Sequence, residues 1–260
     1  MRKWYFMLLL LMVACIGCQW QMRPSDDEEE LSDMTIERYD RVETTYLTLA
    51  DFAALRQMNT DYPTETRMLI EDVLHLGPAT APDINTRLLV YFQDTTLQAL
   101  ISDVEREFEN MDDLNSQLND AFNRLHSMLP DTVNVPRVYA QIGSLDQSVI
   151  VGKGVLGISL DKYLGADYPL YLRFGYTEEQ RAMMTRRYIV PDCIAFYVLS
   201  LFPEPQSHTT DEHFRHIGRV QYIVNMALGS TFFSGEHVDQ ARRDMESGRY
   251  SSYEEFMTRI

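Results

Sequence analysis

Apolar residues recur with helical spacing through the first half of the chain. One stripe runs from Leu97 to Phe108 and a second from Leu114 to Leu129, with apolar side chains three or four positions apart. This spacing places the side chains on one face of a helix, and Pro130 ends the second stripe. The pattern predicts helices over residues 68–76, 84–92, 97–108 and 114–129.

The period changes over residues 135–160. The segments "VPRVYAQIG", "SVIV" and "VLGISL" are short, rich in β-branched residues and interrupted by glycine, which is typical of strands. Lys153 lies between Gly152 and Gly154, a pattern that indicates a hairpin turn. We therefore expect a small antiparallel sheet in the middle of the chain.

Helical signals resume after the predicted sheet. Capping-box patterns begin at Thr177, Thr209 and Ser252. Pro191 suits the first turn of a helix, and the apolar run "DCIAFYVLSLF", which includes Cys193, indicates that this helix is buried. Helices on both sides of a small sheet predict a mostly helical α+β domain.

The N-terminus has the layout of a secretory signal peptide. A basic start precedes an uncharged run over residues 4–17, which is shorter than the ~20 apolar residues of a membrane-spanning helix. The cysteines of "CIGC" end this run, and small or apolar residues before a cysteine are typical of a bacterial lipoprotein signal. We expect lipid attachment at Cys18, because a glycine precedes it and its apolar run is longer; Cys15 is the alternative.

These signals divide the chain into three parts. We predict a lipoprotein signal peptide over residues 1–17, an acidic flexible tether over 18–34, and a single α+β domain over 35–260. The cysteine thiol would receive a diacylglycerol, and fatty acyl chains such as palmitate would hold the mature protein on a membrane of the cell envelope. The polar, acidic segment "QWQMRPSDDEEELSD" fits a solvated tether.

Charge narrows the range of partners. The 260-residue chain has 39 acidic and 23 basic residues and a formal net charge of −16. Such a surface repels nucleic acid and anionic lipid headgroups. We expect no nucleic-acid partner and contact with the membrane through the N-terminal lipid.

Candidate catalytic and metal-binding groups are few. His213 and His216 lie three positions apart on a predicted helix and form an alternative metal pair, with His208, His237 or a carboxylate as a third ligand. No His-Glu-x-x-His motif occurs in the sequence, so helical zinc-peptidase chemistry lacks its paired ligands and its general base. We predict no catalytic residue, no metal and no cofactor.

The segment "DKYLGADYPLYLRFGY" is rich in tyrosine, which offers contact area and a hydrogen-bonding tip. We predict that Tyr168, Tyr171, Arg186 and Asp192 line a cleft beside the sheet, where a peptide or an envelope protein binds. Two alternatives stay open at this point. In the first, the segment is a packed cover for the sheet; in the second, Arg186 belongs to a structural ion pair.

The segments "LPDTVNVPRVYAQIG", "VIVGKGVLGISLDKYLGADYPLY" and "RRYIVPDCIAFYV" resemble the GldB-like family of gliding motility-associated lipoproteins. The resemblance implies a lipid-anchored envelope protein; some members serve the gliding machinery and protein secretion. It also implies a zincin-like, metallopeptidase-like architecture without the metal motif, because the helix from Pro191 lacks the histidine–glutamate pair. The expected function is a non-catalytic interaction or scaffold module, and a cryptic metal-dependent hydrolase is the alternative.

Overall fold

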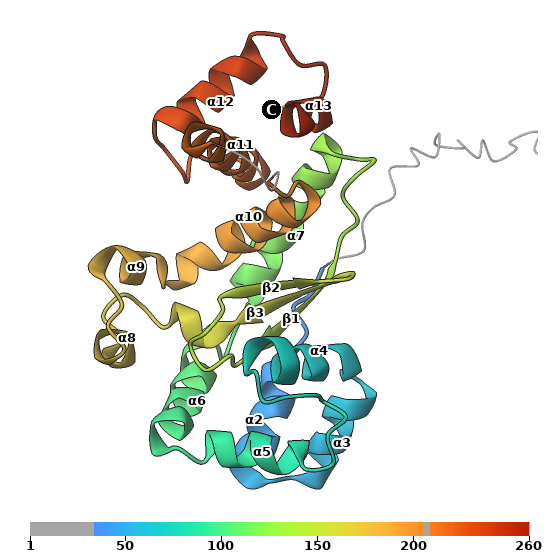
Figure 1. The fold of residues 1–260 in the computed structure, drawn as a ribbon, viewed down its shortest axis with the longest axis vertical. Helices are drawn as coiled ribbons and strands as arrows, with labels where there is room; N and C mark the ends of the chain where they lie inside the picture. The colour runs from blue at the N-terminus through green and yellow to red at the C-terminus, as the bar shows by residue number, and fades with distance from the viewer. Residues whose placement is uncertain (1–33, 205–208, 260) are drawn as a thin grey trace, which may run out of the picture. The chain divides into compact units, whose positions relative to one another are not determined.

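A computed structural model describes residues 34–204 and 209–259 (Figure 1). Asp33–Ile260 forms one compact unit. The predicted signal peptide, all but the last residue of the predicted tether, the candidate lipidation sites Cys15 and Cys18, and His208 lie outside the described residues.

The described part of the chain is mostly helical with a small central sheet. The elements before the sheet are α2 (Tyr39–Leu49), α3 (Phe52–Thr60), α4 (Pro63–Met68), the π-helix η1 (Leu69–Val73), α5 (Ile84–Phe92), α6 (Thr95–Glu107) and α7 (Asp112–Met128). The strands are β1 (Arg137–Gln141), β2 (Val149–Gly152) and β3 (Val155–Ser159). The elements after the sheet are η2 (Leu160–Tyr163), α8 (Pro169–Arg173), α9 (Glu178–Met183), η3 (Arg186–Tyr188), α10 (Ile189–Leu201), α11 (Thr210–Leu228), α12 (Glu236–Glu246) and α13 (Tyr253–Thr258).

Helix boundaries follow local capping chemistry. The predicted capping boxes at Thr177 and Thr209 are both present, at the starts of α9 and α11. Ser252 caps α13 through its side chain, but the carboxylate of Glu255 turns to the amide of Ser251. The helix predicted over residues 68–76 begins earlier, as α4, and continues as the π-helix η1, which ends at Val73.

The sheet is mixed, in the order β1-β3-β2, so the prediction of an antiparallel sheet is wrong for β1. The hairpin of β2 and β3 is antiparallel as predicted and turns at Gly154, whose φ of 72° suits glycine. β1 instead pairs in parallel with β3. The chain leaves β1, passes to the far edge over residues 142–148, and returns so that β3 lies between the other two strands.

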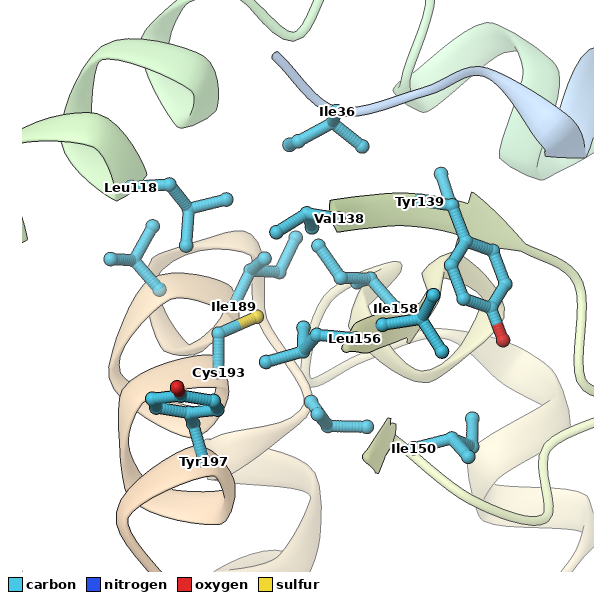
Figure 2. Packing of buried hydrophobic residues seen from close by; sticks show 14 of the residues in the cluster. Ile36, Leu118, Val138, Tyr139, Ile150, Leu156, Ile158, Ile189, Cys193 and Tyr197 are labelled. Carbon is cyan, nitrogen blue, oxygen red and sulfur yellow. The ribbon is translucent and has the colours of Figure 1, made fainter. Parts of the chain in front are cut away.

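One face of the sheet is apolar and packs against α10, which in turn packs against α7. Figure 2 shows Ile189 and Cys193 of α10 facing Val138 and Leu156 of the sheet, with Leu118 of α7 alongside. All five side chains are buried. Full burial of a large aliphatic side chain stabilises the fold by about 1.5–3 kcal/mol, so this face is the main apolar support of the sheet.

The opposite face of the sheet mixes polar and apolar side chains, and α2 and α4 cover most of it. Tyr139 packs edge-on against Tyr39 of α2, with ring centroids 6.0 Å apart. A Cβ atom at Gly157 would lie 2.6 Å from the ring of Tyr139, so glycine is needed where this ring crosses β3. Glu65 of α4 forms an ion pair with Arg137 on the same face.

Candidate functional site

Two buried carboxyl groups hold the loop that follows β1. Glu43 of α2 accepts a hydrogen bond from the amide of Ile142 at 2.9 Å. Asp161, just after β3, accepts from the amides of Gly143 at 2.7 Å and Leu145 at 2.5 Å. Both acidic residues are fully buried. The loop therefore directs three amide groups into the protein, where they cannot rearrange freely.

Burial changes the protonation of both anchoring groups. It raises the pKa of Glu43 well above its usual value, and the amide of Ile142 only partly opposes this effect. The second carboxyl oxygen of Glu43 has no hydrogen-bond partner, which is consistent with a neutral group. Burial also raises the pKa of Asp161, whereas its two amide donors and the ammonium group of Lys162 favour the charged form.

Backbone strain is concentrated beside this loop. Within the described ranges, four residues other than glycine have a positive φ, and three of them lie here: His75 at 51°, Ser144 at 57° and Leu145 at 67°. The fourth, Ala50, ends α2. Such conformations cost about 1–3 kcal/mol each and persist where the surrounding structure enforces them, often at functional sites.

The three strained residues face one hollow of about 430 Å³, which we call the loop hollow. Its walls are formed by Val73, Leu74, His75, Tyr91, Ser144, Leu145, Asp146, Phe174 and Tyr176. The π-helix η1 ends at this wall, and π-helical turns are frequent at functional sites. The hollow thus combines irregular backbone from two segments that are far apart in the sequence.

Polar groups around the loop hollow are held by neighbouring side chains. The hydroxyl groups of Tyr91 and Ser144 lie 2.7 Å apart. Lys162 and Tyr176 both donate to the carbonyl oxygen of Leu145, at 3.2 and 2.7 Å. The hollow can therefore offer fixed hydrogen-bonding groups beside aromatic surface.

The histidine at the loop hollow is turned away from the serine. Its Nδ1 lies 3.1 Å from the carbonyl oxygen of Glu71, and its Nε2 lies 3.9 Å from the carboxylate of Asp146. The hydroxyl of Ser144 contacts Tyr91 instead. A serine nucleophile requires a base within hydrogen-bonding reach, and His75 does not occupy that position in this structure.

Two of the four residues predicted to line a cleft lie behind the loop hollow. Tyr171 is fully buried; its hydroxyl donates to the carbonyl oxygen of Asp161 at 2.6 Å. Its ring packs edge-on against Tyr176 at 5.9 Å and Tyr168 at 5.1 Å. The hydroxyl of Tyr168 donates to Asp103 at 2.9 Å. Both tyrosines support the aromatic wall of the hollow from the inside.

The other two residues lie elsewhere. Arg186 forms an ion pair with Asp113 at 2.6 Å and lines a second hollow, which shares no lining residue with the first. Asp192 lies in the first turn of α10, where it accepts a hydrogen bond from the hydroxyl of Tyr163 at 2.8 Å. The structure thus brings Tyr168 and Tyr171 together and separates them from Arg186.

Asp192 should make the stability of the protein depend on pH. Burial raises its pKa to about 6, although the hydroxyl of Tyr163 opposes the shift. A carboxyl group with a raised folded-state pKa stabilises the fold below its unfolded pKa of about 4, and the contribution is lost as the pH rises through 6.

We therefore expect wild type to lose about 1 kcal/mol relative to Asp192→Asn between about pH 5 and pH 7.5. Urea unfolding of both proteins at the two pH values measures this difference. A difference in stability that does not change with pH would contradict the assignment.

The alternative metal pair does not form a site among residues 34–204 and 209–259. His213 pairs with Glu204 at 2.7 Å, whereas His216 is buried and its burial lowers its pKa. Across this described part of the chain, no group of three or more histidine, cysteine or acidic residues is placed to hold a metal ion. His208, one of the proposed third ligands, falls outside it.

The fold and the site together define the class of this protein: an α+β domain with one strained loop held over a hollow. The chain matches the family model of the gliding motility protein GldB over residues 21–234, and it belongs to this family. The match includes every residue of the loop hollow. No curated protein and no solved structure matches the chain. In the part that the structure describes, no helix has the length and apolar character needed to cross a bilayer.

Proposed function

We propose that this chain is a lipid-anchored protein of the cell envelope that binds a segment of another envelope protein at the loop hollow and does not modify it. The concentration of three strained residues at one hollow carries the proposal. A loop that is already fixed before binding loses little conformational entropy when a ligand arrives, so more of the contact energy contributes to affinity.

The character of the hollow supports a protein segment as the ligand. Phe174 is 59% exposed and Tyr91 is 36% exposed, so apolar rings are available at the rim. Ser144, His75 and Asp146 place hydroxyl, imidazole and carboxylate groups beside them. Apolar walls with a few fixed polar groups are typical of sites that bind side chains of a partner.

A binding role is also supported by the arrangement of potential catalytic groups. The hydroxyl of Ser144 contacts Tyr91 and not the imidazole of His75. A zincin-like architecture is also part of this proposal. It is based on the succession of three parts along the chain: the sheet, the tyrosine-rich crossover and α10. The first turns of α10 carry Pro191, Asp192 and Cys193, which do not supply the histidine–glutamate pair of a zinc peptidase.

The lipid anchor completes the proposal. The predicted signal peptide and Cys18 would fix the protein to a membrane, and the acidic tether would let the domain reach partners beyond the headgroups. The family to which the chain belongs supports this location, because its name designates a lipoprotein. Tight anchoring requires more than one acyl chain, which a diacylglycerol on the cysteine would provide.

Affinity purification after chemical crosslinking tests the proposed partner. We expect the full-length wild-type protein to recover an envelope protein, and Phe174→Asp to lose most of it, because a carboxylate would replace an apolar contact at the rim. Phe52→Asp is the matched control, since Phe52 is 84% exposed and lies outside the hollow. Equal recovery with both variants would contradict a binding role for the loop hollow.

A further inference from the structure

A second hollow, of about 580 Å³, lies where α7, η3 and the end of α11 meet. We call it the arginine hollow. It is lined by Asp113, Leu114, Gln117, Asp120, Arg124, Arg186, Arg187, Pro191, Leu228, Ser230 and Phe232. Three guanidinium groups thus meet on one surface of a protein whose net charge is −16.

Arg186 forms a fixed wall of the arginine hollow. Its guanidinium group makes two hydrogen bonds to the carboxylate of Asp113, at 2.6 and 3.1 Å, and one to the carbonyl oxygen of Asn110 at 2.9 Å. These bonds lower the pKa of Asp113 and keep it ionised. Arg186 and Asp113 therefore neutralise each other within the fold.

The other two arginines are oriented by contacts that leave their charge unpaired. Arg187 lies over the rings of Tyr188 and Phe232, at 5.1 and 6.0 Å. Arg124 donates from Nη1 to the carbonyl oxygen of Ala227 at 3.1 Å. Among residues 34–204 and 209–259, neither guanidinium group has a carboxylate within 4.0 Å.

Arg124 also lies close to the backbone at the end of α11. A Cβ atom at Gly229 would be 3.2 Å from its Nη1, and the φ of 65° at this position suits glycine as well. The guanidinium plane is therefore held between a carbonyl oxygen and a bare backbone position. A guanidinium group that is held in this way can bind an oxyanion with little further loss of conformational freedom.

We propose that the arginine hollow binds the free carboxylate at the C-terminus of a peptide whose last side chain is apolar. The hollow is lined by three arginines and by two aspartates, Asp113 and Asp120. Its net charge is therefore +1, which matches one monoanion. Leu228 and Phe232, which are partly exposed, supply apolar surface beside that charge. Arginine and carboxylate form paired, charge-assisted hydrogen bonds that fix the orientation of the ligand.

A peptide carboxylate fits this hollow better than a membrane or a phosphate dianion. A second negative charge would remain unmatched, because Asp120 already offsets one of the two unpaired arginines. An anionic membrane surface would meet the acidic body of the protein, whose net charge of −16 opposes the approach.

Fluorescence anisotropy with two synthetic peptides tests the proposal. The probes are fluorescein-labelled Gly-Ala-Leu-Phe with a free C-terminus and the same peptide as its C-terminal amide. We expect the amide to bind about tenfold more weakly than the acid, since charge-assisted hydrogen bonds are lost. Arg187→Gln and Arg124→Gln should each weaken binding of the acid to a similar extent.

Arg215→Gln is the matched control, because Arg215 carries the same charge but pairs with Asp211 away from the hollow. It should bind the acid as wild type does, and circular dichroism should show that all variants are folded at the assay temperature. Equal binding of acid and amide would overturn the proposal. A second result would also overturn it: retention of wild type on phosphatidylglycerol vesicles that is lost in Arg187→Gln and Arg124→Gln. That result would assign the hollow to a membrane.

Discussion

Replacing Asp161 with alanine is expected to lower the free energy of unfolding by about 3–5 kcal/mol, because two buried amide groups lose their acceptor. The carboxylate accepts from Gly143 and Leu145 and is fully buried, so water cannot readily replace it. The strained conformations of Ser144 and Leu145 would then lack their support. Urea unfolding at neutral pH measures the loss.

Asp161→Asn gives a graded version of the same test. The amide keeps one acceptor oxygen, so we expect a smaller loss of stability and a protein that still folds. Asp146→Asn is the matched control in the same loop, since its side chain is 56% exposed and its contact with His75 is 3.9 Å long. If Asp161→Ala were as stable as Asp146→Asn, the carboxylate would not be the anchor of the loop.

Replacing Cys18 with serine is expected to abolish lipid attachment and to release the protein from the membrane fraction. Serine lacks the thiol that would receive the diacylglycerol, and each buried methylene of an acyl chain contributes about 0.8 kcal/mol to membrane binding. Fractionation of cells and mass spectrometry of the N-terminal peptide measure the two effects.

Cys15→Ser is the matched control for this prediction. We expect it to stay lipidated, with a mature N-terminus at Cys18. The reverse pattern, with Cys15 modified and Cys18 removable, would move the attachment site by three residues and keep the anchor. Unmodified protein in wild-type cells, with Met1 retained, would contradict lipid anchoring itself.

Helices with a clear apolar stripe could be predicted from the sequence. The segments 84–92, 97–108 and 114–129 correspond to α5, α6 and α7 with small differences at their ends. Their apolar stripes face the core, so the spacing of apolar residues alone is enough to predict these helices. By contrast, no signal indicated the π-helical turn at Leu69–Val73, because a wider hydrogen-bonding pattern leaves the residue types unchanged.

The direction of β1 could not be predicted in the same way. A turn sequence such as Gly152-Lys153-Gly154 identifies a hairpin, because it acts over a few neighbouring residues. The strand that pairs with β1 depends on how the β2–β3 hairpin is placed beside it, and this placement is set by the tertiary fold. Glu43 illustrates the same limit, since nothing near it in the sequence indicates a fully buried carboxyl group.

The candidate site was found from the sequence only in part. The tyrosine-rich segment supplies Phe174 and Tyr176 to the loop hollow, whereas Tyr168 and Tyr171 stand behind it. Ser144 gave no signal, because a positive φ is expected at glycine and Gly143 lies one position earlier. The role of Asp161 as an anchor also gives no signal in the sequence, since its amide partners are 16 and 18 residues away.

Site-specific photocrosslinking in living cells tests the central claim, that the loop hollow of an anchored protein binds an envelope partner. A benzophenone side chain would replace Phe174 at the rim or, as a control, Glu246 at the exposed end of α12. We expect position 174 to capture one envelope protein, with less adduct in the Asp161→Asn background, and position 246 to capture none. Folded, lipidated protein that gives no adduct at 174, or the same adduct at both positions, would contradict it.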